Sequence, residues 1–346
     1  MKRSLTPNER AVLHGLVSRP TLNDRELSET LSVKVSTVTA IRRRLRRVDF
    51  FVARRIPMMH RLGWEILVAG LCRLPVAREA DAAARMREAL GSKHPTFFHV
   101  IQAPDHFVFL AQAPTYTAFA RDLEVFRASI QRAGLSDGMA LQTAVFPLAL
   151  TCLVNFFDFG RILSQAFGFE DSRGIPTKVE KVGDLELTRK EQDVLKGLVR
   201  FPEFSDKAVA AKIKASRQAV SKMRRDFHER GLLRTVRLPD LRALGFELVG
   251  ASFVRYPPQA GLKARAAGIE TVARAAPLFF HAVSNSDAVM LGGIRTYEEV
   301  AKLRASLGQF AEEQGLAVAA PETAVGLASM TDIPRNCDFS AVVQML

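Results

Sequence analysis

The sequence predicts an α+β protein that is made of two copies of one unit, each a group of three helices followed by a β-α-β-β-α-β domain. Two observations support this prediction. Residues 5–24 recur in the same register 182 positions later, so that Leu5 returns as Leu187 and Asp24 as Asp206. Within each copy, the apolar residues first follow the helical period of 3.6 and then form the short apolar runs of strands.

Each copy opens with two capped helices. Thr6 and Glu9 have the spacing of a capping box, in which each side chain binds the backbone N–H of the other residue. The first helix is predicted to end near Val17, because a proline follows. Asn23 is the predicted N-cap of a second helix that ends near Leu31. The equivalent residues of copy 2 are Thr188, Glu191, Val199, Ser205 and Ile213.

A third, basic helix follows in each copy. In 36–47, Val38, Ile41 and Leu45 form one apolar stripe, and an equivalent stripe recurs in 218–230. The remaining faces carry Arg, Lys, Ser and Thr, the residue types that a helix needs to read the major groove of DNA. The positions predicted to contact DNA are Lys34, Ser36, Thr37, Thr39, Arg42, Arg43 and Arg46 in copy 1 and Ser216, Arg217, Gln218, Ser221, Lys222, Arg224 and Arg225 in copy 2.

Extended, basic segments that end in proline come after both third helices. Their arginines are Arg54 and Arg55 in copy 1 and Arg234 and Arg237 in copy 2. A strand at this position is typical of the wing of a winged helix-turn-helix domain, and we predict that its arginines contact DNA phosphate.

The second half of each copy has the order strand, helix, strand, strand, helix, strand. The predicted ranges are 64–74, 77–90, 96–102, 106–112, 115–133 and 140–147 in copy 1, and 246–255, 261–275, 278–284, 288–294, 296–314 and 317–325 in copy 2. This order is that of the ferredoxin-like fold. A short amphipathic helix is predicted in each tail, 155–165 and 336–346.

Five segments therefore make up the predicted chain. They are a winged helix-turn-helix domain over 1–59, a ferredoxin-like domain with a C-terminal helix over 60–168, a polar linker over 169–184, a second winged helix-turn-helix domain over 185–241 and a second ferredoxin-like domain over 242–346.

The composition favours an anionic partner. Forty-nine Lys and Arg residues against 36 Asp and Glu give a net charge of +13, as expected of a protein that binds nucleic acid. No apolar run approaches a membrane span and no signal peptide is evident, so we expect no membrane contact and a cytoplasmic location. Cys72, Cys152 and Cys337 form no CxxC pair, which predicts buried apolar roles. We predict no catalytic residue, metal or cofactor.

Together these elements resemble the Lrp/AsnC family of bacterial and archaeal transcription regulators, here tandemly duplicated. The likeness covers nearly the whole chain and rests on the order of the elements. It includes the Leu-Gly pairs 62–63 and 244–245 before each αβ domain, and Asp105 and Asp287 at each central hairpin. The resemblance implies DNA binding by the first domain, and dimerisation and often small-molecule sensing by the second.

Copy 1 departs from the family pattern at both ends of the third helix. Lys34 stands where the family has a capping Ser, and Asp49 stands where it has a Gly. Copy 2 retains Ser216 and Gly231 at these positions. The glycine that precedes the hairpin Asp in the family is absent from both copies.

His99 and His281 follow a Phe-Phe pair at the same position of the sequence repeat. With Asp105 and Asp287 they are the candidate effector-binding residues. A core or sheet-surface role for the histidines, and a turn-shaping role for the aspartates, are the simpler alternatives, and we favour them.

We predict a sequence-specific DNA-binding transcription regulator that is not an enzyme. Because the two recognition helices differ, we expect an asymmetric site on double-stranded DNA. The duplicated chain is expected to close as a pseudo-dimer, with a true homodimer left open. One alternative is an enzyme like the siroheme decarboxylases, which have this architecture and whose tetrapyrrole pocket would suit the two histidines. Another is a scaffold that binds nucleic acid or protein non-specifically.

Overall fold

The chain folds into two compact units, each assembled from segments that are distant in sequence. The computed structural model describes residues 5–74, 82–90, 94–135, 141–171, 173–257, 262–315 and 321–346. Unit 1 contains Met1–Ala53, Leu153–Lys178 and Thr235–Ser329, and unit 2 contains Arg54–Cys152, Val179–Arg234 and Met330–Leu346. Each unit therefore joins the three-helix segment of one copy to the sheet of the other copy. The five domain ranges stay predictions.

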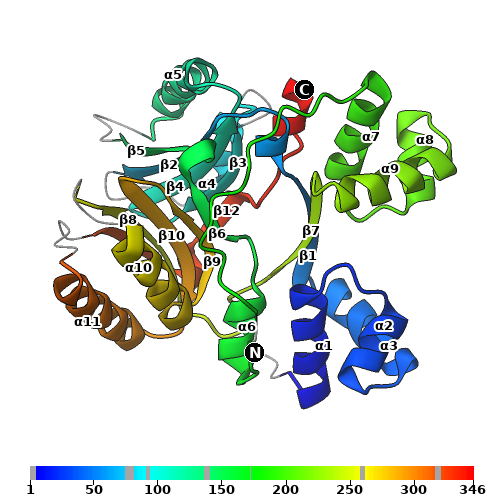
Figure 1. The fold of residues 1–346 in the computed structure, drawn as a ribbon, viewed down its shortest axis with the longest axis horizontal. Coiled ribbons are helices and arrows are strands. Elements are labelled where there is room, and N and C mark those ends of the chain that lie inside the picture. Colours follow the sequence, from blue (N-terminus) through cyan, green and yellow to red (C-terminus); the bar gives the residue numbers. More distant parts are fainter. Residues whose placement is uncertain are drawn as a thin grey trace. The chain divides into compact units, whose positions relative to one another are not determined.

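Both three-helix segments form as predicted (Figure 1). Unit 1 has α1 (Pro7–Ser18), α2 (Asp24–Leu31) and α3 (Val35–Arg47), and unit 2 has α7 (Arg189–Arg200), α8 (Asp206–Ile213) and α9 (Arg217–Glu229). The capping box of α1 is confirmed, since Thr6 Oγ1 accepts the Glu9 N–H at 3.3 Å and the Glu9 carboxylate accepts the Thr6 N–H at 2.8 Å. Asn23 and Ser205 cap α2 and α8. These local signals fix where the helices begin.

The two third helices begin differently and end alike. Ser216 Oγ accepts the Ala219 N–H at 3.1 Å, whereas Lys34 gives α3 no side-chain cap. After the helices, Asp49 (φ 51°) and Gly231 (φ 65°) both adopt the left-handed conformation. Asp is one of the few residues with a side chain that tolerates this region, so copy 1 makes the same turn without glycine.

The basic segments after α3 and α9 are strands, β1 (Phe51–Pro57) and β7 (Leu233–Pro239). Each strand passes from one unit into the other, β1 after Ala53 and β7 after Arg234. The exchange of sheets between the copies therefore takes place along these two strands.

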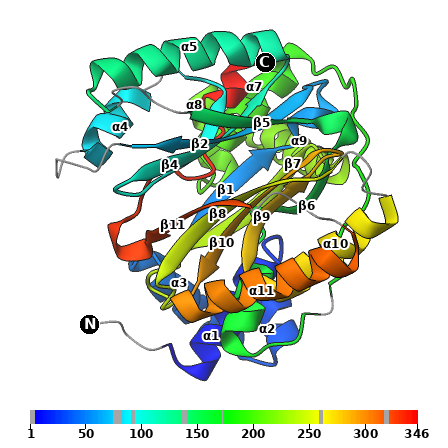
Figure 2. The ribbon, with the colours of Figure 1, turned by 90° about the vertical axis from the view of Figure 1, so that its left-hand side faces the viewer.

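Each unit contains a five-stranded antiparallel sheet with two helices packed on one face (Figure 2). In unit 2 the strand order is β12 (Asp332–Arg335), β3 (Phe97–Gln102), β4 (His106–Ala113), β2 (Ile66–Arg73) and β5 (Leu141–Pro147), with α4 (Ala82–Leu90) and α5 (Tyr116–Arg132). In unit 1 it is β11 (Glu322–Leu327), β8 (Leu248–Arg255), β10 (Asp287–Ile294), β9 (Leu278–Val283) and β6 (Cys152–Phe156), with α10 (Leu262–Ala275) and α11 (Tyr297–Glu313). The predicted α+β class is confirmed. Predicted residues 75–81, 136–140, 258–261 and 316–320 lie outside the described ranges.

The fifth strand of each sheet comes from the tail of the other copy. β6 pairs with β9 and β12 pairs with β3. Side chains and backbone lock these edges: Asn155 Nδ2 donates to the Leu278 carbonyl at 2.6 Å, and the Asp338 N–H donates to the Phe98 carbonyl at 2.7 Å. The tails were predicted as helices alone. The first tail has a helix, α6 (Gly160–Phe167), but the second has a short 3-10 helix (Val342–Met345).

The interior of unit 2 is rich in phenylalanine, where Phe97, Phe109 and Phe126 pack between the sheet and α5. All three cysteines are buried, as predicted, and are free thiols. Burial raises the pKa of Cys72 to about 12 and that of Cys152 to about 11. Within the described ranges, no helix is both long and apolar enough to cross a membrane.

Candidate nucleic-acid interface

The third helices bury their apolar stripes and expose much of their basic faces. Val38, Ile41 and Leu45 of α3 are buried, as predicted. Of the predicted contact residues, those exposed to solvent are Lys34, Ser36, Arg43 and Arg46 on α3 and Ser216, Arg217, Gln218, Lys222 and Arg225 on α9. The half-buried ones are Thr37, Thr39, Arg42, Ser221 and Arg224. Arg47 is also exposed, and the sequence prediction missed it although it continues the same run of arginines.

One arginine on each third helix pairs with the first residue of the second helix. Arg42 Nη1 lies 2.8 Å from Asp24 Oδ1, and Arg224 Nε lies 2.9 Å from Asp206 Oδ1. Thr39 Oγ1 also donates to the Asp24 carboxylate at 2.6 Å. These contacts neutralise one charge in each unit and fix the angle between the second and third helices. The neighbouring Arg43 and Arg225 are exposed to solvent.

Two of the strand arginines form hydrogen bonds within their own units, which the sequence did not predict. Arg55 Nη1 donates to the Leu198 carbonyl at 3.3 Å in unit 2, and Arg237 donates to the Leu16 carbonyl in unit 1. Burial, together with a neighbouring arginine, lowers the pKa of both guanidinium groups to about 10. Their contact with phosphate stays a prediction. All four predicted wing arginines are half-buried: Arg54, Arg55, Arg234 and Arg237.

The two histidines are not structurally equivalent, contrary to the sequence repeat. His99 lies opposite Leu110 in the β3–β4 ladder, whereas Phe280 takes the corresponding place in the β9–β10 ladder and His281 lies opposite Met290. In these strands the two copies correspond at a displacement of 181 residues. This is one residue fewer than the displacement between the two three-helix segments. Because a one-residue shift turns a side chain to the other face of a sheet, the two histidines face opposite sides of their sheets.

Both histidines are neutral core residues. Each is 2% exposed, and burial lowers the pKa of His99 to about 3 and that of His281 to about 4. His99 Nδ1 accepts the Cys337 N–H at 3.2 Å. Among the described residues, no cluster of His, Cys, Asp and Glu could hold a metal ion. These contacts support the core role, and effector binding by the histidines stays a prediction.

The hairpin aspartates have local partners. Asp105 Oδ1 lies 2.7 Å from His106 Nδ1 at the β3–β4 turn. At the β9–β10 turn the Asp287 N–H donates to Ser284 Oγ at 3.1 Å, and the Asp287 carboxylate lies 3.5 Å from Arg255. These contacts support turn-shaping roles, and effector binding by the two aspartates also stays a prediction.

The buried histidines predict a loss of stability in mild acid. Below pH 6.5 the unfolded chain binds a proton at each histidine, whereas the folded chain does not until about pH 4 or 3. Stability is therefore full above pH 6.5 and falls below it by about 1.4 kcal/mol per pH unit for each histidine. The double variant His99→Phe with His281→Val carries at each position the residue that stands there in the other copy. In urea unfolding, its free energy of unfolding should fall less between pH 7 and pH 5 than that of the parent protein. An equal loss in both proteins would contradict the assignment.

Comparison with known proteins finds a similar fold among solved structures. No family model and no curated protein matches the sequence. Among solved structures, the siroheme decarboxylase NirDL is 12% identical, with a TM-score of 0.51 over 98% of both chains. Its complex with an iron-uroporphyrin III analogue matches equally, over 98% of this chain and 97% of that one. A transcriptional regulator from Neisseria meningitidis bound to L-Met is 19% identical, with a TM-score of 0.31 over 41% of this chain and 90% of its own.

This comparison contradicts the prediction that the chain is not an enzyme, because the siroheme decarboxylase NirDL, whose fold this chain matches over 98% of both chains, is an enzyme. At 12% identity the likeness shows the fold and no individual residue role. The siroheme decarboxylase alternative is therefore supported at least as well as the regulator.

Proposed function

We propose that the chain binds double-stranded DNA through the exposed faces of α3 and α9. The observation that carries this proposal is that, of two adjacent arginines on each third helix, one is paired within its unit and the other is exposed. Arg42 and Arg224 bind carboxylates of their own units, while Arg43 and Arg225 are exposed beside them. A helix whose orientation is fixed internally and whose outer face is cationic can contact both phosphates and base edges.

The two interfaces differ at the start of the helix. Copy 1 exposes Lys34 and Ser36, whereas copy 2 exposes Ser216, Arg217 and Gln218. The side chains that reach base edges usually lie in the first turns of a recognition helix. We therefore expect the two helices to prefer different half-sites and the whole site to be asymmetric.

A binding titration tests this proposal. The purified chain would be titrated against DNA from upstream of its own gene, with random-sequence duplex as competitor, at two salt concentrations. A specific regulator should prefer its site by a factor of about 10³ or more, and the affinity should fall steeply with salt. Equal binding to random duplex would argue against sequence-specific recognition, and a palindromic footprint would argue against two different half-sites.

A second candidate function is an enzyme that acts on a carboxylated tetrapyrrole. The full-length fold match to NirDL supports it. The histidines do not, because they are buried in different units and on opposite faces of their sheets. Since function depends on particular sites more than on fold, we rank DNA binding first, and the exposed basic faces support this ranking.

Incubation with siroheme tests the second candidate. An enzyme of this kind should bind the tetrapyrrole, which would shift its visible absorption band, and should convert it to products that mass spectrometry identifies by the loss of carboxyl groups. Bound siroheme that is recovered intact would support a carrier or sensor in place of an enzyme. An unchanged spectrum would remove this candidate.

A further inference from the structure

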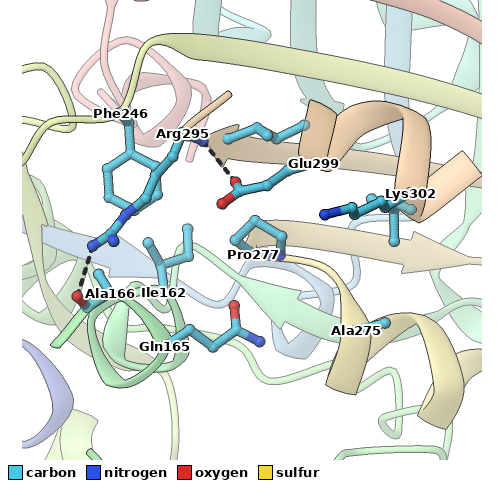
Figure 3. A pocket seen from close by; sticks show the side chains of 11 residues that line it. Ile162, Gln165, Ala166, Phe246, Ala275, Pro277, Arg295, Glu299 and Lys302 are labelled. Carbon is cyan, nitrogen blue, oxygen red and sulfur yellow. Dashed lines mark hydrogen bonds between the residues drawn. The ribbon is translucent and has the colours of Figure 1, made fainter. Parts of the chain in front are cut away.

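A pocket opens in unit 1 between α6, α11 and the ends of α10 and β10 (Figure 3). Its volume of about 350 Å³ is within the range of small-molecule sites. The lining is largely apolar and includes Ile162, Phe246 and Leu303, of which the first two are buried. At about 30 Å³ for each water-sized group, the volume suits a ligand of roughly a dozen non-hydrogen atoms.

Arg295 forms a cationic wall of this pocket. Its guanidinium group lies 5.7 Å from the centroid of the Phe246 ring and donates to the Ala166 carbonyl at 2.6 Å. These contacts hold the group in place beside the apolar lining. The Glu299 carboxylate accepts the backbone N–H of Arg295 at 3.0 Å and so caps the start of α11. The lining carries two positive side chains, Arg295 and Lys302, against the single carboxylate of Glu299, so the pocket favours an anion over a cation.

Lys302 supplies a second positive charge at the opening. Its ammonium group lies 2.7 Å from the Glu298 carboxylate, and both side chains are 74% exposed. An exposed pair of this kind is weak, so the ammonium group is available to a bound anion. Gln165 on α6 adds an amide from the opposite side (Figure 3).

Unit 2 has a buried polar network where unit 1 has this pocket. At the displacement of 181 residues that relates β3, β4 and α5 to β9, β10 and α11, Pro277 corresponds to Thr96 and Leu303 to Asp122. In unit 2 the Asp122 carboxylate accepts the Thr96 N–H at 3.0 Å and lies 2.9 Å from His94 Nδ1. In unit 1 neither proline nor leucine can form this network, and both line the pocket. The two copies have therefore diverged at one place in the fold.

We propose that the pocket of unit 1 binds a small organic anion, a monocarboxylate with a compact apolar body. The carboxylate lies between Arg295 and Lys302, and the apolar body packs against Ile162, Phe246 and Leu303. Unit 2 does not bind such a ligand, because its polar network occupies the corresponding space. This site is separate from the basic faces of α3 and α9, and its occupancy does not depend on DNA.

Calorimetric titration of the full chain with 3-phenylpropionate tests the proposal. The neutral 3-phenylpropionamide and the cationic 3-phenylpropylamine have the same apolar body and serve as ligand controls. We expect the acid to bind at least about tenfold more tightly than the amide, since a charge-assisted hydrogen bond is about twice as strong as a neutral one. Equal binding of acid and amide, or no detectable binding of the acid, would overturn the assignment.

Three variants locate the bound probe. Ala275 is exposed at the pocket, so Ala275→Phe should fill the space without disturbing the core and should weaken binding at least about tenfold. Lys302→Ala should weaken it about 3- to 10-fold. Arg121→Ala changes the equivalent exposed position of unit 2 and should have no effect. Undiminished binding by Ala275→Phe would show that the probe binds elsewhere.

Discussion

Replacing Arg43, Arg47, Arg217 and Arg225 together by alanine is expected to lower the affinity for duplex DNA about 10²- to 10³-fold at physiological salt. All four side chains are exposed on or beside α3 and α9. Each lost phosphate contact should also reduce the slope of log affinity against log salt by about one. Fluorescence anisotropy with a labelled duplex, measured at several salt concentrations, gives both quantities.

A matched variant separates this effect from the general charge of the chain. Arg121, Arg127, Arg274 and Arg304 are also exposed, but they lie on the helices that cover the sheets. Changing these four to alanine removes the same charge from the +13 of the protein. We expect the affinity and the salt slope of this variant to stay close to those of the parent. Equal losses of affinity in both variants would show that DNA binding depends only on the net charge of the protein.

Asp122→Leu is expected to lower the free energy of unfolding of unit 2 by about 3 kcal/mol. The Asp122 carboxylate is buried and accepts the Thr96 N–H and hydroxyl, and His94 Nδ1 lies beside it. Leucine would leave these polar groups without a partner in the core. The single tryptophan, Trp64, is buried in unit 2, so its fluorescence during urea unfolding follows this unit.

Two further variants test the cause of this loss. His94→Ala and Thr96→Pro, added to Asp122→Leu, import all three residues that stand at these positions in unit 1. The triple variant should lose less stability than the single one, because fewer buried polar groups are left unpaired. Arg121→Ala, next to Asp122 but exposed, should change stability by less than about 0.5 kcal/mol. A loss under about 1 kcal/mol in Asp122→Leu would show that the network contributes little.

The sequence alone was sufficient for features that depend on near neighbours in the chain. The capping boxes at Thr6 and Thr188, the apolar stripe of α3 and the strand and helix order of each copy all follow from contacts within a few residues. The duplication itself was also visible, as was the concentration of arginine on the third helices. The candidate DNA interface was therefore proposed from sequence with only Arg47 overlooked.

The histidines show that residues equivalent in a sequence repeat can differ in their structural positions when the displacement between the copies changes by one residue. The Phe-Phe-His motif recurs at a displacement of 182 residues, but the β3–β4 and β9–β10 ladders correspond at a displacement of 181. Because side chains alternate between the faces of a strand, one residue of shift decides whether a histidine faces the helices or the opposite side. No local pattern in the sequence indicates to which face of its sheet each histidine points.

Only the tertiary structure shows which copy supplies the fifth strand of each sheet. Strand β6 could pair with either of two similar edge strands, β3 of its own copy or β9 of the other copy. Both edges offer the same unpaired backbone groups. The repeat makes these edges nearly alike in sequence, and only the tertiary structure shows that β6 pairs with β9, where Asn155 Nδ2 donates to the Leu278 carbonyl. The sequence by itself therefore determined the longer helices, the strands other than β6 and β12, and the order of these elements, because they depend on local interactions. The exchange of sheets between copies and the pocket of unit 1 depend on how distant segments pack, and only the folded chain shows them.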